Sequence, residues 1–111
     1  MQIDIGGREI EAEVADTVLK RSLGLSFMKK GKMLFKFPKD TTAPIDMMFM
    51  RDSLHLYFMD SSKEVIYVEE AEPWYRLPGK LFHRPEGRYR YLLESFEELD
   101  IEEGDVLEFQ E

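Results

Sequence analysis

The stretch "DMMFMRDSLHLYFMD" at residues 46–60 decides the fold, because it alternates in the way that a β-strand alternates between two faces. Counting every second residue gives one face made of Met48, Met50, Asp52, Leu54, Leu56 and Phe58. The other face holds Met47, Phe49, Arg51, Ser53, His55, Tyr57 and Met59. We expect two strands here, or one long bent strand, with the first face in the core and Asp52 interrupting it.

The methionines of this stretch also raise the question of a metal. Met47, Met48, Met50 and Met59 with His55 offer the soft donors that copper(I) prefers. The alternation divides these methionines between the two faces, however, and methionine commonly fills irregular gaps in a core. We therefore interpret them as packing residues, and we predict no metal site and no cofactor.

Similar alternation on both sides of this stretch predicts more strands. The alternating runs are residues 2–5, 8–14, 31–38, 64–72, 88–95 and 106–109. Gly6-Gly7 predicts a hairpin turn between the first two, Pro38 is expected to end the third, and Gly104 is expected to turn the chain before the last. Residues 60–63 read as a turn, and residues 73–87 as a long loop.

One helix is expected. Residues 15–25 change to helical spacing, with Asp16 or Thr17 as the cap and Gly24 at the end. Residues 96–99 are expected to add a helical turn. The predicted fold of residues 1–111 is a single domain, mainly β with one short α-helix, built as a small antiparallel or mixed β-barrel or sandwich of about seven strands.

Composition excludes several classes of protein. The chain has no cysteine and only two histidines, which excludes disulfides, thiolate nucleophiles and three-histidine metal sites. No apolar run reaches the ~18 residues that a bilayer span needs, and "MQIDIGGREIEAEV" lacks the basic and apolar regions of a signal peptide. We expect a cytoplasmic protein without membrane contact. Charged residues make up 34% of the chain and asparagine is absent, which favours a thermostable protein.

Charge is unevenly distributed. The net charge of −8 argues against nucleic acid as a general partner. Residues 17–39 nevertheless hold seven Lys or Arg and no acid, and residues 73–93 hold five basic residues and one acid. These segments are either solvated faces or one surface for an anion or an acidic partner.

The order of segments resembles the family known as domain of unknown function 192, in its archaeal type. The matching segments are "ADTVLKRSLGLSF" (15–27), "GKMLFKFP" (31–38), residues 46–60, Pro73-Trp74, "RYLLE" (90–94) and "IEEGD" (101–105). The resemblance covers nearly the whole chain. It implies a compact β-rich fold with a helix after the first strands, and it implies no established activity.

The chain departs from this family at several positions. Ser26 replaces a methionine, and Asp52-Ser53 replaces Phe-Pro. The family's His-then-Asp pair is reversed here as Asp46 and His55. A reversed pair predicts that the two side chains touch. A regular strand would place Asp46 on the core face, so either Asp52-Ser53 breaks the alternation or this contact does not exist.

Two kinds of site follow from these residues. The first is a pocket for a small anion, with Arg51 as the bidentate donor and with His55, Trp74, Arg76 and His83 as further ligand-binding residues. The second is an acid–base dyad of Asp46 and His55 with Arg51 as an anion clamp, although no G-x-S-x-G nucleophile motif is present. The acids Glu69, Glu70 and Glu72 read as a solvated strand end.

We therefore predict a binding module that is not an enzyme, specific for a small anionic ligand or an acidic protein partner. The alternatives are a small hydrolase-like enzyme that uses Asp46 and His55, and a weak nucleic-acid binder that uses residues 17–39 and 73–93. The oligomeric state is expected to be a monomer or a weak homo-oligomer.

Overall fold

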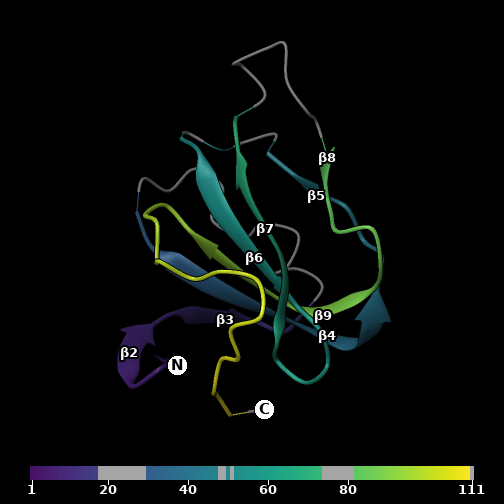
Figure 1. Ribbon diagram of the computed structural model, residues 1–111. Helices are drawn as coiled ribbons and strands as arrows, with labels where there is room; N and C mark the ends of the chain where they lie inside the picture. The colour runs from purple at the N-terminus through teal and green to yellow at the C-terminus, as the bar shows by residue number, and fades with distance from the viewer. Residues whose placement is uncertain (18–29, 48–49, 51, 74–81, 111) are drawn as a thin grey trace.

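A five-stranded mixed sheet forms the centre of the molecule (Figure 1). The computed structural model describes residues 1–17, 30–47, 50, 52–73 and 82–110. In sheet order the central strands are β3 (Glu13–Ala15), β4 (Lys32–Thr41), β9 (Tyr89–Ser95), β6 (Leu54–Met59) and β7 (Val65–Ala71). β3 runs parallel to β4, and the other neighbours are antiparallel. Among the described strands this sheet ends at β3 and β7, so the expected barrel is not closed, and the remaining strands form two separate two-stranded sheets.

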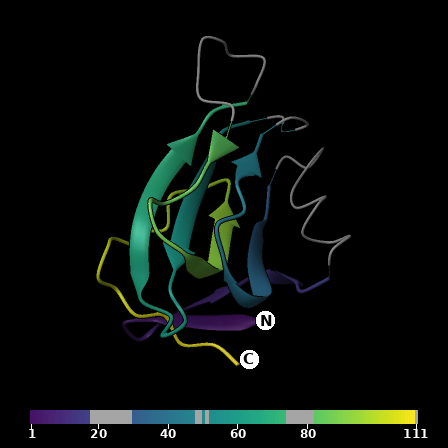
Figure 2. The ribbon, with the colours of Figure 1, turned by 90° about the vertical axis from the view of Figure 1, so that its right-hand side faces the viewer.

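The predicted N-terminal hairpin is confirmed. β1 (Gln2–Ile5) pairs with β2 (Arg8–Glu11), and Ile5 lies opposite Arg8. Gly6 and Gly7 have φ of 57° and 85°, the left-handed values that a two-residue hairpin turn needs at both positions. Figure 2 shows this hairpin, in purple, lying across one end of the central sheet.

The predicted strand at residues 31–38 is present and longer than expected. β4 continues past Pro38 to Thr41, but its pairing with β9 stops at Lys36 and resumes only at Thr41. Proline has no N–H to donate to a ladder. Pro38 therefore lies in the unpaired part of the strand, where no donor is required.

Residues 46–60 form two strands. β5 (Ile45–Asp46) pairs with β8 (Phe82–His83), while β6 begins only at Leu54. The alternation is interrupted before Asp52-Ser53, because the Met50 N–H donates to the Met47 carbonyl at 3.2 Å and both methionines, three residues apart, lie in the same buried cluster as Leu54. β8 also interrupts the loop expected at residues 73–87. We call the β5–β8 pair the ribbon; Figure 1 shows it far from the hairpin.

Both faces of the central sheet are buried, whereas the alternation pattern led us to expect only one. One face carries Leu34, Tyr57, Met59 and Leu93 and packs against the hairpin and residues 99–109, and we call it the hairpin-side core. The other is the ribbon-side core, made of Ala15, Met33, Phe35, Met47, Met50, Leu54, Leu56, Phe58, Ala71, Tyr89 and Leu92. The predicted core residues Leu54, Leu56 and Phe58 are confirmed, but Tyr57 and Met59 on the opposite face are equally buried.

The described residues contain no helix. The helix expected within residues 15–25 falls mostly in residues 18–29, which lie outside the described ranges. Residues 96–97 form a bend instead of starting the expected helical turn at 96–99. The Ser95 hydroxyl accepts from the Glu97 N–H and donates to the Glu97 carbonyl. Within the described ranges, no helix has the length and apolar character to span a membrane.

Tyr57→Phe is expected to lower the free energy of unfolding by about 1–3 kcal/mol, the cost of leaving a buried donor unpaired. The Tyr57 hydroxyl accepts a hydrogen bond of 3.0 Å from the Leu99 N–H, and both residues are buried. Urea denaturation measures the change. Val106→Ala is a suitable control because Val106 is 55% exposed. A loss in Tyr57→Phe no larger than that of the control would show that the hydroxyl does not hold residues 99–109.

Candidate ligand site

The residues predicted to bind a ligand are only partly described by the structure. Arg51, Trp74 and Arg76 lie outside the described residues. His55 and His83 are both described, but they lie on different faces of the central sheet.

His55 is on the face of the hairpin-side core. Its neighbours Leu54 and Leu56 both point into the ribbon-side core, so His55 points the opposite way. Its Nε2 lies 3.5 Å from the Glu70 carboxylate, across the β6–β7 pair. Asp46 is on the ribbon, over the other face. The expected Asp46–His55 contact is therefore not formed, and the acid–base dyad built on it is lost.

Glu94 is a buried carboxyl on the ribbon-side face. It lies between Met33 of β4 and Leu56 of β6, the cross-strand partners that share its face, and it is only 4% exposed. Burial first, and then the charge of Asp46, raises its pKa to about 8. At neutral pH the Glu94 carboxyl is therefore mostly protonated.

A chain of three polar side chains lies on the same face. The Tyr67 hydroxyl donates to Glu69 at 3.0 Å, and the other Glu69 oxygen lies 2.6 Å from His83 Nδ1. Glu69 is opposite Leu56, so Glu69 and Glu94 flank Leu56 in one row across β7, β6 and β9. The side chain of Glu69 is 14% exposed, which corrects its interpretation as part of a solvated strand end.

His83 makes a hydrogen bond through one of its two ring nitrogens. The register pairs Ile45 with His83, so these two side chains share the inner face of the ribbon. His83 is 2% exposed. Among the buried side-chain nitrogen and oxygen atoms of the described residues, its Nε2 is the one without a hydrogen-bond partner. If Nδ1 carries the proton toward Glu69, Nε2 is left as a hydrogen-bond acceptor.

The inner layer between ribbon and sheet thus presents two buried polar groups, the Glu94 carboxyl and His83 Nε2. Asp46 is exposed on the outer face of the ribbon, near enough for its charge to act on Glu94. Such groups can bind a polar ligand or transfer a proton to one. Among the described residues no group of three or more His, Asp or Glu side chains is placed to hold a metal ion.

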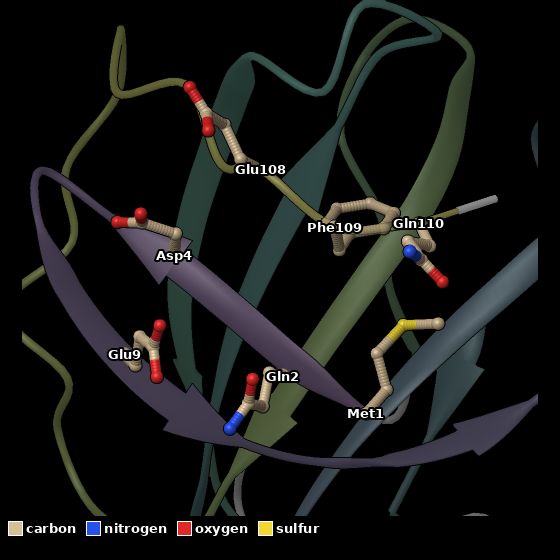
Figure 3. Close-up of a pocket in the computed structure, with 7 residues that line it drawn as sticks. All are labelled: Met1, Gln2, Asp4, Glu9, Glu108, Phe109 and Gln110. Atoms are coloured by element: carbon tan, nitrogen blue, oxygen red, sulfur yellow. The ribbon is translucent and has the colours of Figure 1, made fainter.

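A depression lies at the other end of the molecule. It has a volume of about 570 Å³ and is lined by Met1, Gln2, Asp4, Glu9, Glu108, Phe109 and Gln110. Figure 3 shows its three carboxylates well apart, on β1, β2 and the C-terminal segment. They are solvated to different degrees and the groove lacks a buried unpartnered group, so the inner layer of the ribbon is the stronger candidate.

Comparisons with known proteins agree on the family. The family model DUF192, described as uncharacterized ACR, matches residues 1–109. A UPF0127 protein of Pyrococcus furiosus is 35% identical over 112 residues, which covers 93% of this chain and 91% of that protein. A UPF0127 protein of Pyrococcus horikoshii is 34% identical over 90 residues, covering 78% and 73%.

A solved structure shares the fold. A protein of unknown function from Novosphingobium aromaticivorans matches with a TM-score of 0.84 and 20% identity, over 97% of this chain and 84% of that one. At this identity the likeness concerns architecture alone.

Proposed function

We propose that this chain, which belongs to the DUF192 family, is a binding module that is not an enzyme, with a small-ligand site in the inner layer between ribbon and sheet. One observation carries the proposal: His83 is 2% exposed and its Nε2 has no hydrogen-bond partner among the described residues, while the Glu94 carboxyl, 4% exposed, lies on the sheet face that the ribbon covers. Asp46 and Glu69 complete the charge environment of the site.

A buried polar group without a hydrogen-bond partner destabilises the folded protein. A buried donor or acceptor without a partner costs about 1–3 kcal/mol, and such groups are rare in folded proteins. A ligand that supplies the missing partners removes that cost. Sites that keep such groups therefore commonly serve binding or catalysis.

The layer also has side chains that can make room for a ligand. Met33, Met47 and Met50 belong to the ribbon-side core that surrounds Glu94. Methionine is unbranched and changes conformation at little cost, which is why it recurs at adaptable binding surfaces. Met47 and Met50 are thus packing residues that also suit a ligand site.

The anion site expected around Arg51, Trp74 and Arg76 remains a variant of this proposal. His83 is its described member in the layer, whereas His55 is not available to the same ligand because it lies on the other face. Nucleic-acid binding is less well supported. Several basic residues of the two segments already contact acids or carbonyl oxygens: Lys32 contacts Glu97, Arg90 contacts Asp40 and Arg84 contacts Thr42.

Thermal unfolding with simple probes tests the proposal. We expect at least one of n-butylamine, acetate and inorganic phosphate to raise the melting temperature of the wild type, on the order of 10 °C at 100 times its dissociation constant. The shift should vanish in His83→Gln and Glu94→Gln. His55→Gln is the matched control and should keep it, because His55 faces away from the layer. No shift with any probe, or equal shifts in all four proteins, would refute the proposal.

A further inference from the structure

We propose that residues 84–87 form the centre of a docking surface for a short acidic segment of a partner protein. These residues lie in the connection from β8 to β9, which Figure 1 draws in light green at the right-hand side of the molecule. This surface is separate from the inner layer of the ribbon, and the proposal does not depend on the ligand site there.

Two depressions meet at this connection. One has a volume of about 490 Å³ and is lined by Ile66 and Tyr67 of β7 together with residues 84–87. The other has a volume of about 450 Å³ and is lined by Phe82 together with residues 84–86. Because residues 84–86 line both depressions, the two adjoin along the connection, and we call the pair the turn groove.

The turn groove offers apolar surface to a partner. Phe82 is 53% exposed at one end, and Ile66 is half-buried at the other. Aromatic residues and arginine are enriched at the contacts between proteins. The groove combines both kinds of residue with depressions that can hold an apolar side chain of the partner.

Arg84 gives the turn groove its preference for an acid. Its Nη1 donates to the Thr42 carbonyl at 3.2 Å in an exposed position. A carbonyl does not neutralise a guanidinium, and this bond uses one of the five N–H donors that the group has. A carboxylate can therefore pair with Arg84 through two parallel hydrogen bonds. Arg88 is also exposed and adds a second positive charge next to the turn.

The carboxylates of a protein segment suit this groove better than the phosphates of a nucleic acid. Glu86 lines both depressions, and the whole chain has a net charge of −8. A nucleic acid brings a run of negative charges against both. An acidic side chain beside an apolar one presents a single charge to Arg84 and leaves its apolar neighbour for Phe82 or Ile66.

An NMR titration tests the proposal. The protein, labelled with nitrogen-15, is titrated with the peptide Ac-Leu-Glu-Leu-Glu-Leu-NH2 and with its neutral counterpart Ac-Leu-Gln-Leu-Gln-Leu-NH2. We expect the acidic peptide to shift the amide signals of Ile66, Phe82, Arg84, Glu86 and Gly87. The neutral peptide should bind about fivefold more weakly, which is the upper end for a solvent-exposed charge pair.

Variants assign the contact to single side chains. Arg84→Gln should weaken binding of the acidic peptide about fivefold, because it removes the guanidinium that the carboxylate contacts. Glu86→Gln should strengthen binding about twofold, a gain that a misfolded variant could not produce. Arg90→Gln is the matched control, since Arg90 already pairs with Asp40 at 3.0 Å. Its affinity should stay within about twofold of the wild type.

Several results would overturn the proposal. They are equal affinity for the two peptides, equal weakening by Arg84→Gln and Arg90→Gln, and no shift of any signal at millimolar peptide. Shifts confined to the depression at Met1 and Phe109 would overturn it as well. If a uridine hexanucleotide shifted the same signals at lower concentration than the acidic peptide, the turn groove would be assigned to nucleic acid instead of a partner protein.

Discussion

The stability of Glu94→Gln relative to the wild type is expected to increase by about 4 kcal/mol between pH 5 and pH 9. The folded protein keeps the Glu94 proton up to a pKa of about 8, while the unfolded chain loses it near the ordinary value of 4.5. Between these values folding takes up a proton, so wild-type stability falls as pH rises and reaches its full loss above pH 8. Glutamine cannot ionise and escapes this loss.

Urea denaturation of both proteins at pH 5, 7 and 9 measures the effect. Glu97→Gln is the matched control, because Lys32 lowers the pKa of the fully exposed Glu97. The Glu97–Lys32 pair has the opposite pH dependence, since it stabilises the protein at neutral pH and is lost in acid. Solvent screening makes it small. If the stability difference between wild type and Glu94→Gln were the same at all three pH values, the folded protein would not raise the pKa of Glu94.

Phe58→Ala is expected to lower the free energy of unfolding by about 3–5 kcal/mol, the usual cost of removing a buried aromatic ring. Phe58 is fully buried on β6, with its ring 4.9 Å from that of Tyr89 in an edge-to-face contact and 5.9 Å from that of Tyr67. Tyr89 in turn donates a hydrogen bond of 2.6 Å to the Ala43 carbonyl just before the ribbon, and Tyr67 holds Glu69. The Phe58 ring thus supports the two tyrosines that contact the segment before the ribbon and Glu69.

Denaturation midpoints of Phe58→Ala and of Val106→Ala, a surface control, provide this comparison. A loss below about 1 kcal/mol in Phe58→Ala would contradict the prediction. It would mean that the ribbon-side core tolerates the cavity that the missing ring leaves.

Local chemistry explains why much of the fold could be predicted from the sequence. Gly6-Gly7 and Gly104 adopt the positive φ values that their turns require, and the runs around them alternate as strands do. The ribbon could not be predicted, because a two-residue strand has no period and its pairing joins residues 45 and 83. Barrel closure and burial of the second face of β6 likewise depend on which distant segments cover the sheet.

The site could be predicted only in part for the same reason. His83 was expected as a ligand residue, but its partners Glu69 and Tyr67 belong to a different strand. Glu94 was missed, although "LLES" offers a signal: the acid shares its strand face with buried Leu92. An acid at an apolar position of a central strand is worth testing. The Asp46–His55 pair failed because a strand break and a sheet separate the two residues.

The most direct test of the site is the titration of the Glu94 carboxyl by carbon-13 NMR, with Glu94→Gln to assign the signal. The account predicts a pKa near 8. A titration near the ordinary value of 4.5 would contradict it.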